Sequence, residues 1–334
     1  MKTLFESLFR SNAWLRIYSI IAITRLINRI GARLVIDGSA PRTIRWSDHL
    51  VVITGGSRGM GGRVCELLKE KGARVVVIDK AAKSLHGKED LFLEADVTKE
   101  EELIQARKQV HSELGYPTML ISAAGIARHS VVMDPPHRFP SSFSNAVIDV
   151  NLKGSFNFVK VFGQDLLSDY DEEQDQELFP IRNNFGGHIL MIGSGAAFAP
   201  LPANATYNAS KAGIVSLHHT LNYEIQSWHK SDRVRNSVFC PLMIHTDMTK
   251  DRMKEQKNQF IFPTLTVDQA AAKIVKVLEQ DRSQVFFAPA GAYALSLLMP
   301  NLPAWLIRLV ANGGGSGSTF SEYLHKQRLP IGEH

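Results

Sequence analysis

The sequence predicts an α/β protein with a doubly wound parallel sheet, and three observations lead to this class. Short apolar runs rich in β-branched residues recur along the chain, separated by segments long enough for helices. A glycine-rich turn links the first of these runs to an amphipathic segment. The chain has 334 residues, of which 44% are hydrophobic, and this is enough to bury a large core. Such alternation predicts a parallel sheet with helices on both faces.

Residues 1–36 form a separate segment that is basic and apolar together. They contain six Lys and Arg residues against a single acid, Glu6. The longest apolar run, residues 17–24, has eight residues, far short of the roughly 20 that span a bilayer as a helix. Arginines interrupt the apolar sequence and no small-residue cleavage site follows it, so a secretory signal peptide is not expected.

In a helical conformation this segment would carry an apolar stripe beside a basic one. The apolar stripe consists of Ile23, Leu26, Ile27, Ile30 and Leu34. The basic stripe consists of Arg25, Arg29 and Arg33, and the nearby aromatic residues are Phe5, Phe9, Trp14 and Tyr18. This pattern predicts a helix that lies in a membrane interface. The alternative is an amphipathic helix packed on the protein's own core.

A βαβ unit begins after residue 45, and we expect it to bind a dinucleotide. A short apolar strand leads into a turn with Gly55, Gly59 and Gly61, a helix follows, and a second strand ends at Asp79. The glycines let the backbone approach a pyrophosphate, whose charge is met by amide groups and the positive end of the helix. An acid eighteen residues after Gly61 completes the context of a Rossmann-type site.

Asp79 favours NAD as the dinucleotide. A carboxylate at the end of the second strand accepts hydrogen bonds from the ribose hydroxyls of adenosine and repels a 2′-phosphate. Arg58 in the glycine loop and Lys80 after the aspartate would instead attract that phosphate, so NADP is the alternative cofactor.

Five further apolar runs complete the expected sheet. They are residues 91–97, 118–125, 186–194, 235–242 and 283–289. We therefore expect a Rossmann-type catalytic domain at residues 45–290, preceded by the membrane-associating segment 1–36 and followed by an apolar tail at 291–334. An acidic run between residues 167 and 185 is expected to be a solvated loop.

Over about residues 48–290 the motifs, taken in order, resemble the short-chain dehydrogenase/reductase family. The matching positions are the TGxxxGxG loop from Thr54 to Gly61, the adenine-contacting pair Asp96 and Val97, the helix asparagine Asn151, the serine Ser194, the YxxxK pair Tyr207 and Lys211, and the segment from Pro241 to Thr246. Leu242 stands where the family usually has glycine. Ser122 to Gly125 read SAAG where the family usually has NNAG, so we expect altered local hydrogen bonding there and little effect on the chemistry.

The residue types of this cluster suit proton transfer. On a helix, Tyr207 and Lys211 share a face, one turn apart. A free tyrosine has a pKa near 10 and is a poor base at neutral pH, whereas a nearby ammonium favours its phenolate. Ser194 would position the substrate oxygen and stabilise the charge that develops on it. In alcohol oxidation Tyr207 would take the hydroxyl proton while hydride passes to the nicotinamide. The resemblance implies that Asn151 holds a water linking Lys211 to solvent.

The expected cofactor contacts combine the glycine loop, the strand ends and the catalytic helix. They are Gly55, Ser57, Arg58, Gly59, Met60, Gly61, Asp79, Asp96, Val97, Ala124, Gly125, Tyr207, Lys211, Pro241, Ile244 and Thr246. No metal site is expected, because neither Cys65 nor Cys240 has a partner at metal-ligand or redox spacing. Likewise, no other candidate metal ligand lies at a suitable spacing from His218, His219 or His245.

The chain is uncharged from Ser283 to Ile307, and Pro300 and Pro303 divide the tail into two short helices. Apolar helices of this kind form a lid or a membrane-facing surface. The tail resembles that of the membrane-associated retinol and 17β-hydroxysteroid dehydrogenases of the family. That resemblance implies residence on the endoplasmic reticulum or lipid droplets, with the catalytic domain in the cytosol.

Together these features predict an NAD(H)-linked, membrane-associated dehydrogenase of a hydrophobic alcohol such as a sterol, a retinoid or a long-chain alcohol. One alternative is an NADPH-dependent lipid ketone reductase, similar to the 3-ketosphinganine reductases. The other is a lipid-droplet scaffold that binds nucleotide without turnover. The family resemblance implies a homodimer. No nucleic-acid partner is expected, because the sequence has no recognisable nucleic-acid-binding motif.

Overall fold

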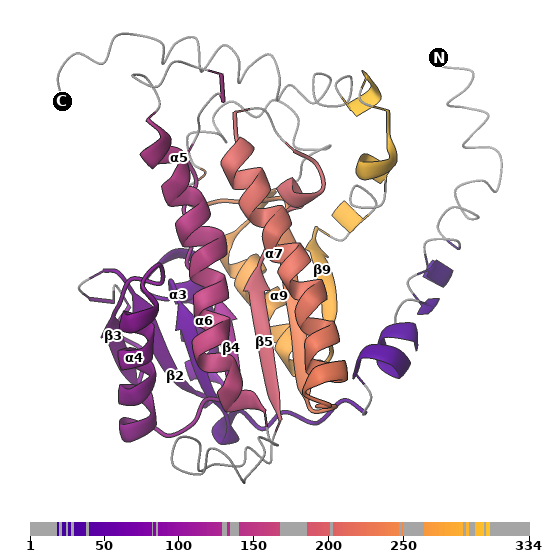
Figure 1. Cartoon of the computed structure of the whole chain (residues 1–334). Helices are drawn as coiled ribbons and strands as arrows, with labels where there is room; N and C mark the ends of the chain where they lie inside the picture. The colour runs from indigo at the N-terminus through magenta and orange to yellow at the C-terminus, as the bar shows by residue number, and fades with distance from the viewer. Residues whose placement is uncertain are drawn as a thin grey trace.

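The computed structural model of the chain describes residues 40–128 except 82 and 85, then 140–167, 186–200, 203–246, 249 and 264–289, together with residues 132 and 133 and parts of the two ends between 19 and 37 and between 292 and 307. Within these residues a seven-stranded parallel sheet has the order β3-β2-β1-β4-β5-β6-β9 (Figure 1). Its strands are β1 (Leu50–Thr54), β2 (Arg74–Asp79), β3 (Leu91–Glu94), β4 (Met119–Ser122), β5 (Gly187–Ile192), β6 (Val234–Pro241) and β9 (Gln284–Ala288). The strand order runs outward in both directions from the β1 and β4 pair, so the sheet is doubly wound, as the sequence predicts.

All five of the later strands end before the apolar runs that predicted them, and the early ends of β3 and β5 place site residues in loops. β3 stops at Glu94 because the chain turns toward the next helix: Asp96 N donates to the Glu102 carboxylate at 2.7 Å, and Lys99 N donates to the Asp96 carbonyl at 2.9 Å. Likewise, β5 stops at Ile192, and Ser194 lies in the turn that follows.

Helices cover both faces of the sheet (Figure 1). On one face α3 (Gly59–Glu70) packs against α9 (Val267–Glu279). The other face carries α4 (Glu100–Glu113), α6 (Gly154–Phe162) and α7 (Ala205–Tyr223). A further helix, α5 (Ser141–Ile148), leads into α6 through the π-helical turn η3 (Asp149–Lys153). The short remaining elements are η1 (Ala32–Asp37), η2 (Trp46–Asp48), η4 (Gly163–Leu166), η5 (Gly195–Ala197), η6 (Glu224–Trp228), β7 (Met243–Ile244), β8 (Thr264–Leu265) and η7 (Met299–Asn301).

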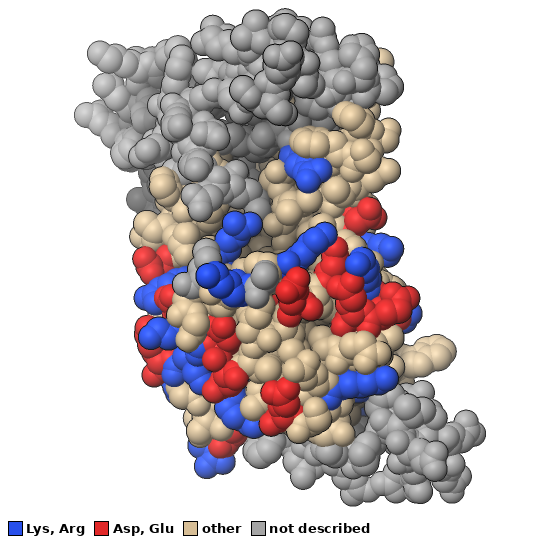
Figure 2. Space-filling view, turned by 90° about the vertical axis from the view of Figure 1, so that its left-hand side faces the viewer, with Lys and Arg blue, Asp and Glu red and all other residues tan. Residues whose placement is uncertain are grey.

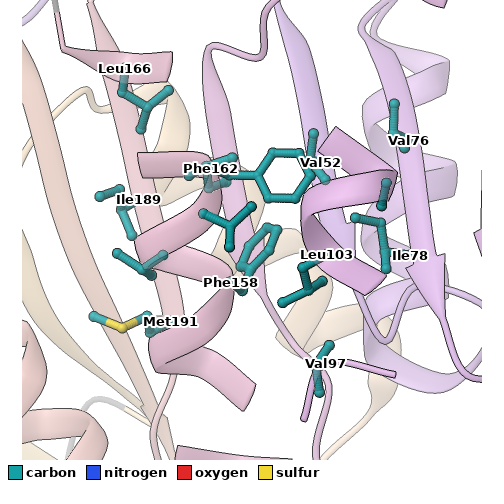
Figure 3. Packing of buried hydrophobic residues seen from close by; sticks show 14 of the residues in the cluster. Val52, Val76, Ile78, Val97, Leu103, Phe158, Phe162, Leu166, Ile189 and Met191 are labelled. Carbon is teal, nitrogen blue, oxygen red and sulfur yellow. The ribbon is translucent and has the colours of Figure 1, made fainter. Parts of the chain in front are cut away.

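The central strands are apolar on both sides because each face of the sheet is covered. Figure 3 shows one of the two apolar layers, in which Phe158 and Phe162 of α6 and Leu103 of α4 lie against the sheet. Val52 of β1 belongs to this layer, whereas its neighbour Val51 belongs to the layer under α3 and α9. Successive side chains of a strand point to opposite faces of the sheet, so these two neighbouring valines pack in different layers.

A buried ionic cluster fixes the chain before residue 45 to the amino ends of β6 and β9. Arg235 is fully buried, and it donates to the Asp37 carbonyl at 2.6 Å and to the Asp281 carbonyl at 3.0 Å. Arg42 holds the Asp281 carboxylate through two hydrogen bonds of 2.8 and 2.6 Å. The amide of Ser283 donates to the Asp37 carboxylate at 2.9 Å. The segment that precedes the βαβ unit is thus attached to the edge of the sheet that β6 and β9 form.

The apolar stripe of the N-terminal segment is exposed where the structure describes it. Ile23, Leu26, Ile27 and Ile30 are helical, and between 50% and 65% of each is accessible to solvent. This exposure does not support the alternative in which the stripe packs on the protein's own core. No helix among the described residues has both the length and the apolar character needed to cross a bilayer.

The face that carries β3 and α4 mixes charges of both signs (Figure 2). Ion pairs such as Lys99 with Glu102 and Lys160 with Glu100 account for part of this mixture. The basic stripe residues Arg25 and Arg29, the acidic run at 168–185 and the tail beyond residue 307 lie outside the described residues, as do the side chains of Arg33 and Leu34. The domain limits at residues 36, 45 and 290 stay predictions.

Candidate active site

A cavity of about 800 Å³ lies at the carboxyl ends of the central strands. The order of a doubly wound sheet reverses between β1 and β4, which is where such folds form their ligand crevice. All predicted cofactor contacts except Ser57 line this cavity, and so does Ser194. Its volume is within the range of roughly 300–1,000 Å³ found for ligand pockets.

The glycine loop has the geometry that a bound pyrophosphate needs. Gly55 and Gly59 have φ values of 69° and 59°, which glycine adopts without strain. A Cβ on Gly61 would lie 2.3 Å from the Gly55 carbonyl oxygen, so the helix can begin this close to the loop only with glycine. The first amides of α3 therefore face the cavity at the positive end of the helix.

Asp79 is held at the end of β2 with its carboxylate at the cavity. Its Oδ2 accepts hydrogen bonds from the Ser57 hydroxyl at 2.5 Å and the Ser57 amide at 3.2 Å, and its Oδ1 accepts from the Ala81 amide at 3.1 Å. Ser57, predicted as a cofactor contact, therefore acts here on Asp79 and does not line the cavity. The carboxylate remains an acceptor for the ribose hydroxyls of a dinucleotide.

Lys80 is paired with Asp96, and both residues line the cavity. Lys80 Nζ lies 2.7 Å from Asp96 Oδ2. Burial raises the pKa of Asp96, but hydrogen bonds from Lys80 and from the amide and hydroxyl of Thr98 outweigh this and hold it at about 2. Of the two cations that would attract a 2′-phosphate, Lys80 thus already has a carboxylate partner, whereas Arg58 is exposed at the start of α3.

Tyr207 and Lys211 lie on one face of α7, a helical turn apart, as predicted. Lys211 is buried, its Nζ donates to the Ile192 carbonyl at 2.8 Å, and the same atom lies 5.8 Å from the centre of the Tyr207 ring. Burial lowers the pKa of Lys211 to about 8, while the Cys240 thiol opposes that change. The ammonium therefore lies directly under the tyrosine it is expected to influence.

Ser194 is fixed by the turn after β5 and keeps a proton to donate. Its Oγ accepts a hydrogen bond from the Ala196 amide at 3.1 Å, which caps η5. A hydroxyl that accepts one bond still has its own O–H, and this can reach a substrate oxygen in the cavity. Ser194 and Tyr207 both line the cavity, so the structure brings together the two groups predicted to act on one oxygen atom.

Asn151 lies behind the cavity wall in the π-helical turn η3, where an enlarged turn redirects the side chain. Its Oδ1 accepts from the Ile126 amide at 2.8 Å, and its Nδ2 donates to the Ile126 carbonyl at 3.0 Å and the Ser210 hydroxyl at 3.1 Å. A Cβ on Gly125 would lie 3.3 Å from Asn151 Oδ1 and 3.8 Å from Lys211 Nζ. The asparagine and the lysine thus flank Gly125, with one lone pair of Oδ1 left for a water.

The two departures from the family pattern have local consequences. Ser122, in place of an asparagine, donates to the Ser155 hydroxyl at 2.9 Å and so connects β4 to α6, which is the altered hydrogen bonding expected there. Leu242, in place of glycine, lines the cavity, and its Cδ2 would lie 2.6 Å from a Cβ placed on Gly195. It therefore narrows the cavity beside the turn of Ser194.

Sequence reasoning missed several residues of the cavity wall. They are Ile78, Ala81, Ala95, Ala123, Ile126, Ala127, Val150, Ile192, Gly193, Met243 and Thr249. Four of them, Ala95, Ala123, Ile192 and Gly193, end a strand or directly follow one, and this position was the only signal available in the sequence. Thr249 shapes the wall by accepting a hydrogen bond from the Thr246 amide at 3.0 Å.

A dinucleotide cradle at one end of the cavity and a Tyr–Lys–Ser cluster at the other define an oxidoreductase that acts on CH–OH or carbonyl groups with a nicotinamide cofactor. Residues 49–257 match the family model described as short chain dehydrogenase. The chain belongs to this family, whose members use NAD or NADP.

Three known proteins show how far the similarity extends. The chain is 32% identical over 214 residues to carbonyl reductase family member 4 of Danio rerio, covering 62% of this chain and 80% of that protein. It is 29% identical over 214 residues to 3-oxoacyl-[acyl-carrier-protein] reductase of Homo sapiens, covering 62% and 81%. A short chain dehydrogenase from Burkholderia cenocepacia, solved in complex with NADP, has a TM-score of 0.59 at 24% identity, covering 75% of this chain and 91% of that one. This last similarity concerns the fold.

Proposed function

We propose that the chain is a membrane-associated, NAD(H)-linked dehydrogenase that oxidises a hydrophobic alcohol, such as a sterol, a retinoid or a long-chain alcohol, to its carbonyl compound. The observation that carries this proposal is a row of aromatic contacts that joins the turn after Ser194 to the C-terminal segment. Phe198, four residues after Ser194, contacts Phe287 of β9 with ring centres 5.4 Å apart, and Phe287 contacts Tyr293 at 5.7 Å. These half-buried rings give an apolar character to the region beside the Ser194 turn, and this favours a lipid substrate.

Beyond Tyr293 the described residues expose large apolar side chains. Leu298 is 58% exposed and Trp305 is 64% exposed, on the yellow segment beyond the carboxyl end of β9 (Figure 1). Exposed apolar groups of this size favour contact with a membrane surface. The exposed stripe from Ile23 to Ile30 supports the same conclusion at the other end of the chain.

The residues of the cavity then divide the chemistry among them. A nicotinamide bound in the cavity would supply the hydride acceptor for the alcohol carbon. Tyr207 takes the hydroxyl proton, Lys211 stabilises the phenolate that does so, and Ser194 donates a hydrogen bond to the same substrate oxygen. Asn151 would hold a water that links Lys211 to solvent, and this link would let the proton taken by Tyr207 leave by way of Lys211. Reduction of the carbonyl compound reverses these steps.

Asp79 supports NAD as the preferred cofactor, because a 2′-phosphate would meet its carboxylate and Lys80 is already paired with Asp96. The second candidate is an NADPH-dependent reductase of a lipid ketone. The exposed Arg58 at the cavity favours it, and so does the similarity to proteins named as a carbonyl reductase and a 3-oxoacyl reductase.

Initial rates in detergent, with sterols, retinoids, long-chain alcohols and their carbonyl compounds, decide between these candidates. Each substrate is measured with NAD(H) and with NADP(H). We expect turnover of at least one lipid alcohol and a preference for NAD(H). A strong preference for the phosphorylated cofactor would establish the reductase instead, and turnover of only small water-soluble alcohols would refute a lipid substrate.

We further propose that the protein forms a homodimer on the endoplasmic reticulum or on lipid droplets, with the catalytic domain in the cytosol. Fractionation of tagged full-length chain, a chain lacking residues 1–36, and a full-length variant with Ile23, Leu26, Ile27 and Ile30 replaced by serine tests the attachment. The first form should sediment with membranes and the other two should be released. Full-length protein recovered entirely in the soluble fraction would contradict the proposal.

A further inference from the structure

A thiol, an imidazole and a carboxylate meet behind the glycine loop, outside the cavity described above. Cys65 lies on α3, and His86 and Glu89 lie on the loop between β2 and β3. The ligand atoms of the three residues all lie within 4.8 Å of one another. Cys65 is fully buried, and only 8% and 9% of the His86 and Glu89 side chains are exposed. We propose that these three residues bind one divalent cation of the zinc type.

The hydrogen bonds of His86 place an acceptor atom beside the Glu89 carboxylate. His86 Nε2 lies 2.8 Å from the Gly56 carbonyl oxygen, and because a carbonyl only accepts, Nε2 carries the proton. The other ring nitrogen, Nδ1, then has a lone pair, and it accepts from the Lys88 amide at 3.1 Å. The same lone pair faces Glu89 Oε2 at 3.1 Å, so two acceptors lie against each other.

The Glu89 carboxylate gives independent support. Its Oε2 is buried and has no hydrogen-bond partner among the described residues. An unpaired buried carboxylate oxygen is costly, and a cation between Glu89 Oε2 and His86 Nδ1 would remove both the cost and the clash of lone pairs. The Lys88 amide belongs to an exposed residue and can turn to solvent when Nδ1 binds a metal.

The mixture of donors selects the kind of cation. Sulfur, nitrogen and oxygen ligands together suit Zn²⁺, which binds each of them at about 2.0–2.3 Å, whereas Mg²⁺ and Ca²⁺ take oxygen ligands. In a tetrahedral zinc site the ligand atoms lie roughly 3–4 Å apart, so a small contraction of the cluster would complete it. The three residues leave a fourth position for water.

Cys65 must lose its proton to bind the cation. Each cation bound through Cys65 releases this proton, so the apparent affinity should rise with pH.

The site would couple metal binding to the cofactor loop. A histidine that binds metal through one nitrogen usually donates its other N–H to a fixed acceptor, and here that acceptor is the carbonyl of Gly56, the residue after Gly55. The ring also lies against the start of α3, since a Cβ on Gly62 would be 3.1 Å from His86 Cδ2. A cation at His86 thus strengthens a hydrogen bond that orients the pyrophosphate-binding turn.

Cobalt(II) titration of full-length protein treated with a chelator tests the proposal, since Co²⁺ bound to a thiolate gives a charge-transfer absorption that Zn²⁺ quenches by competition. We expect one Co²⁺ per chain with this absorption. Cys65→Ala should abolish this absorption. Glu89→Gln keeps the size of the side chain and should weaken Co²⁺ binding by more than roughly 10–100-fold, the loss typical when a residue that only hydrogen-bonds to a metal ligand is replaced. Zn²⁺ should also tighten NADH binding by about fivefold or more in the unsubstituted protein alone.

The matched control is Cys240→Ala, because Cys65 and Cys240 are the two cysteines of the chain. This variant should retain the cobalt–thiolate absorption. An absorption that survives Cys65→Ala, or Co²⁺ bound equally well by Glu89→Gln, would overturn the proposed site. Zinc binding with unchanged affinity for NADH would overturn its coupling to the glycine loop.

Discussion

At the scale of single residues, the proposed chemistry depends on a buried charge beneath a tyrosine. Lys211 Nζ donates one hydrogen bond to the Ile192 carbonyl and lies under the Tyr207 ring. In this surrounding the ammonium is poorly solvated, so it acts more strongly on a neighbouring phenolate than a surface lysine would. The same burial makes its own proton easier to lose, and the two effects lead to separate predictions.

Replacing Tyr207 by phenylalanine should lower kcat by roughly 10²–10⁴-fold, because the general acid and base is removed while the ring that packs in α7 is kept. Affinity for NADH, measured by fluorescence titration, should change little. The control is Tyr223→Phe, at the exposed end of the same helix, which should keep full activity. Equal activity of the two variants would show that Tyr207 does not transfer the proton.

The pKa of Lys211 predicts the pH dependence of activity. Since burial lowers this pKa to about 8, the free enzyme holds Lys211 charged below about pH 8 and loses the charge above it. The profile of kcat/KM, which reports groups of the free enzyme, should therefore fall above about pH 8. In Lys211→Arg this limb should move out of the measurable range, because a guanidinium stays charged, even if the rate is low. The same limb in both proteins would assign it to another group.

At the scale of elements, the first turn of α3 has no room for a side chain at Gly61, where it approaches the glycine loop. Gly61→Ala places a Cβ 2.3 Å from the Gly55 carbonyl oxygen, and this contact with backbone cannot be relieved by moving a side chain. Overpacking of this kind costs about 1–3 kcal/mol, which predicts roughly tenfold to hundredfold weaker binding of NADH. Calorimetric titration measures the change.

Gly163→Ala is the matched control for this substitution. It also adds one methyl group at a glycine, but the nearest atom, Val159 Cγ1, lies 3.7 Å away, at ordinary contact distance. Its affinity for NADH should equal that of the unsubstituted protein. If Gly61→Ala also bound NADH normally, the close approach of α3 to the loop would not be what admits the cofactor.

The elements also show what the sequence can and cannot predict. The strands, the glycine loop and the helix with Tyr207 and Lys211 follow from local patterns, since spacing within one element places their side chains. The π-helical turn at Asn151 has no such pattern, because its enlarged turn depends on contacts with Ile126 and Ser210 from other segments. The contact of Cys65 with the loop after β2 likewise arises only when α3 packs beside that strand.

At the scale of the whole molecule, charge and apolar surface are distributed unevenly along the chain. Residues 1–36 carry six basic residues and one acid, a surplus of five that equals the net charge of +5 of the chain. The remaining residues are therefore balanced, in keeping with the mixed face in Figure 2. The buried contacts of Asp37 and Arg42 connect the basic segment to the sheet. In the membrane attachment proposed above, attraction to an anionic surface would act on one end of a chain that is otherwise balanced in charge.

Acid stability of the whole molecule depends on buried histidines. Among the described residues these are His49, His188 and His218, and burial lowers the pKa of each. Burial lowers the pKa of His188 to about 3 and that of His218 to about 4. The unfolded chain binds a proton at each below about pH 6.5 while the folded chain does not, so stability is complete above pH 6.5 and is lost as the pH falls toward these folded values. At pH 5 the lowered pKa of each of these two histidines should reduce the free energy of unfolding by about 2 kcal/mol relative to pH 7.

Urea unfolding between pH 7 and pH 5 measures this loss, and His188→Gln isolates one share of it. The glutamine amide can replace the contact of His188 Nε2 with the Ser237 hydroxyl, 2.9 Å long, and it binds no proton in this range. The variant should therefore lose about 2 kcal/mol less than the unsubstituted protein over the same interval. His229→Gln, at an exposed position, should leave the pH dependence unchanged. An identical loss in all three proteins would mean that His188 is charged, or exposed to solvent, in the folded state.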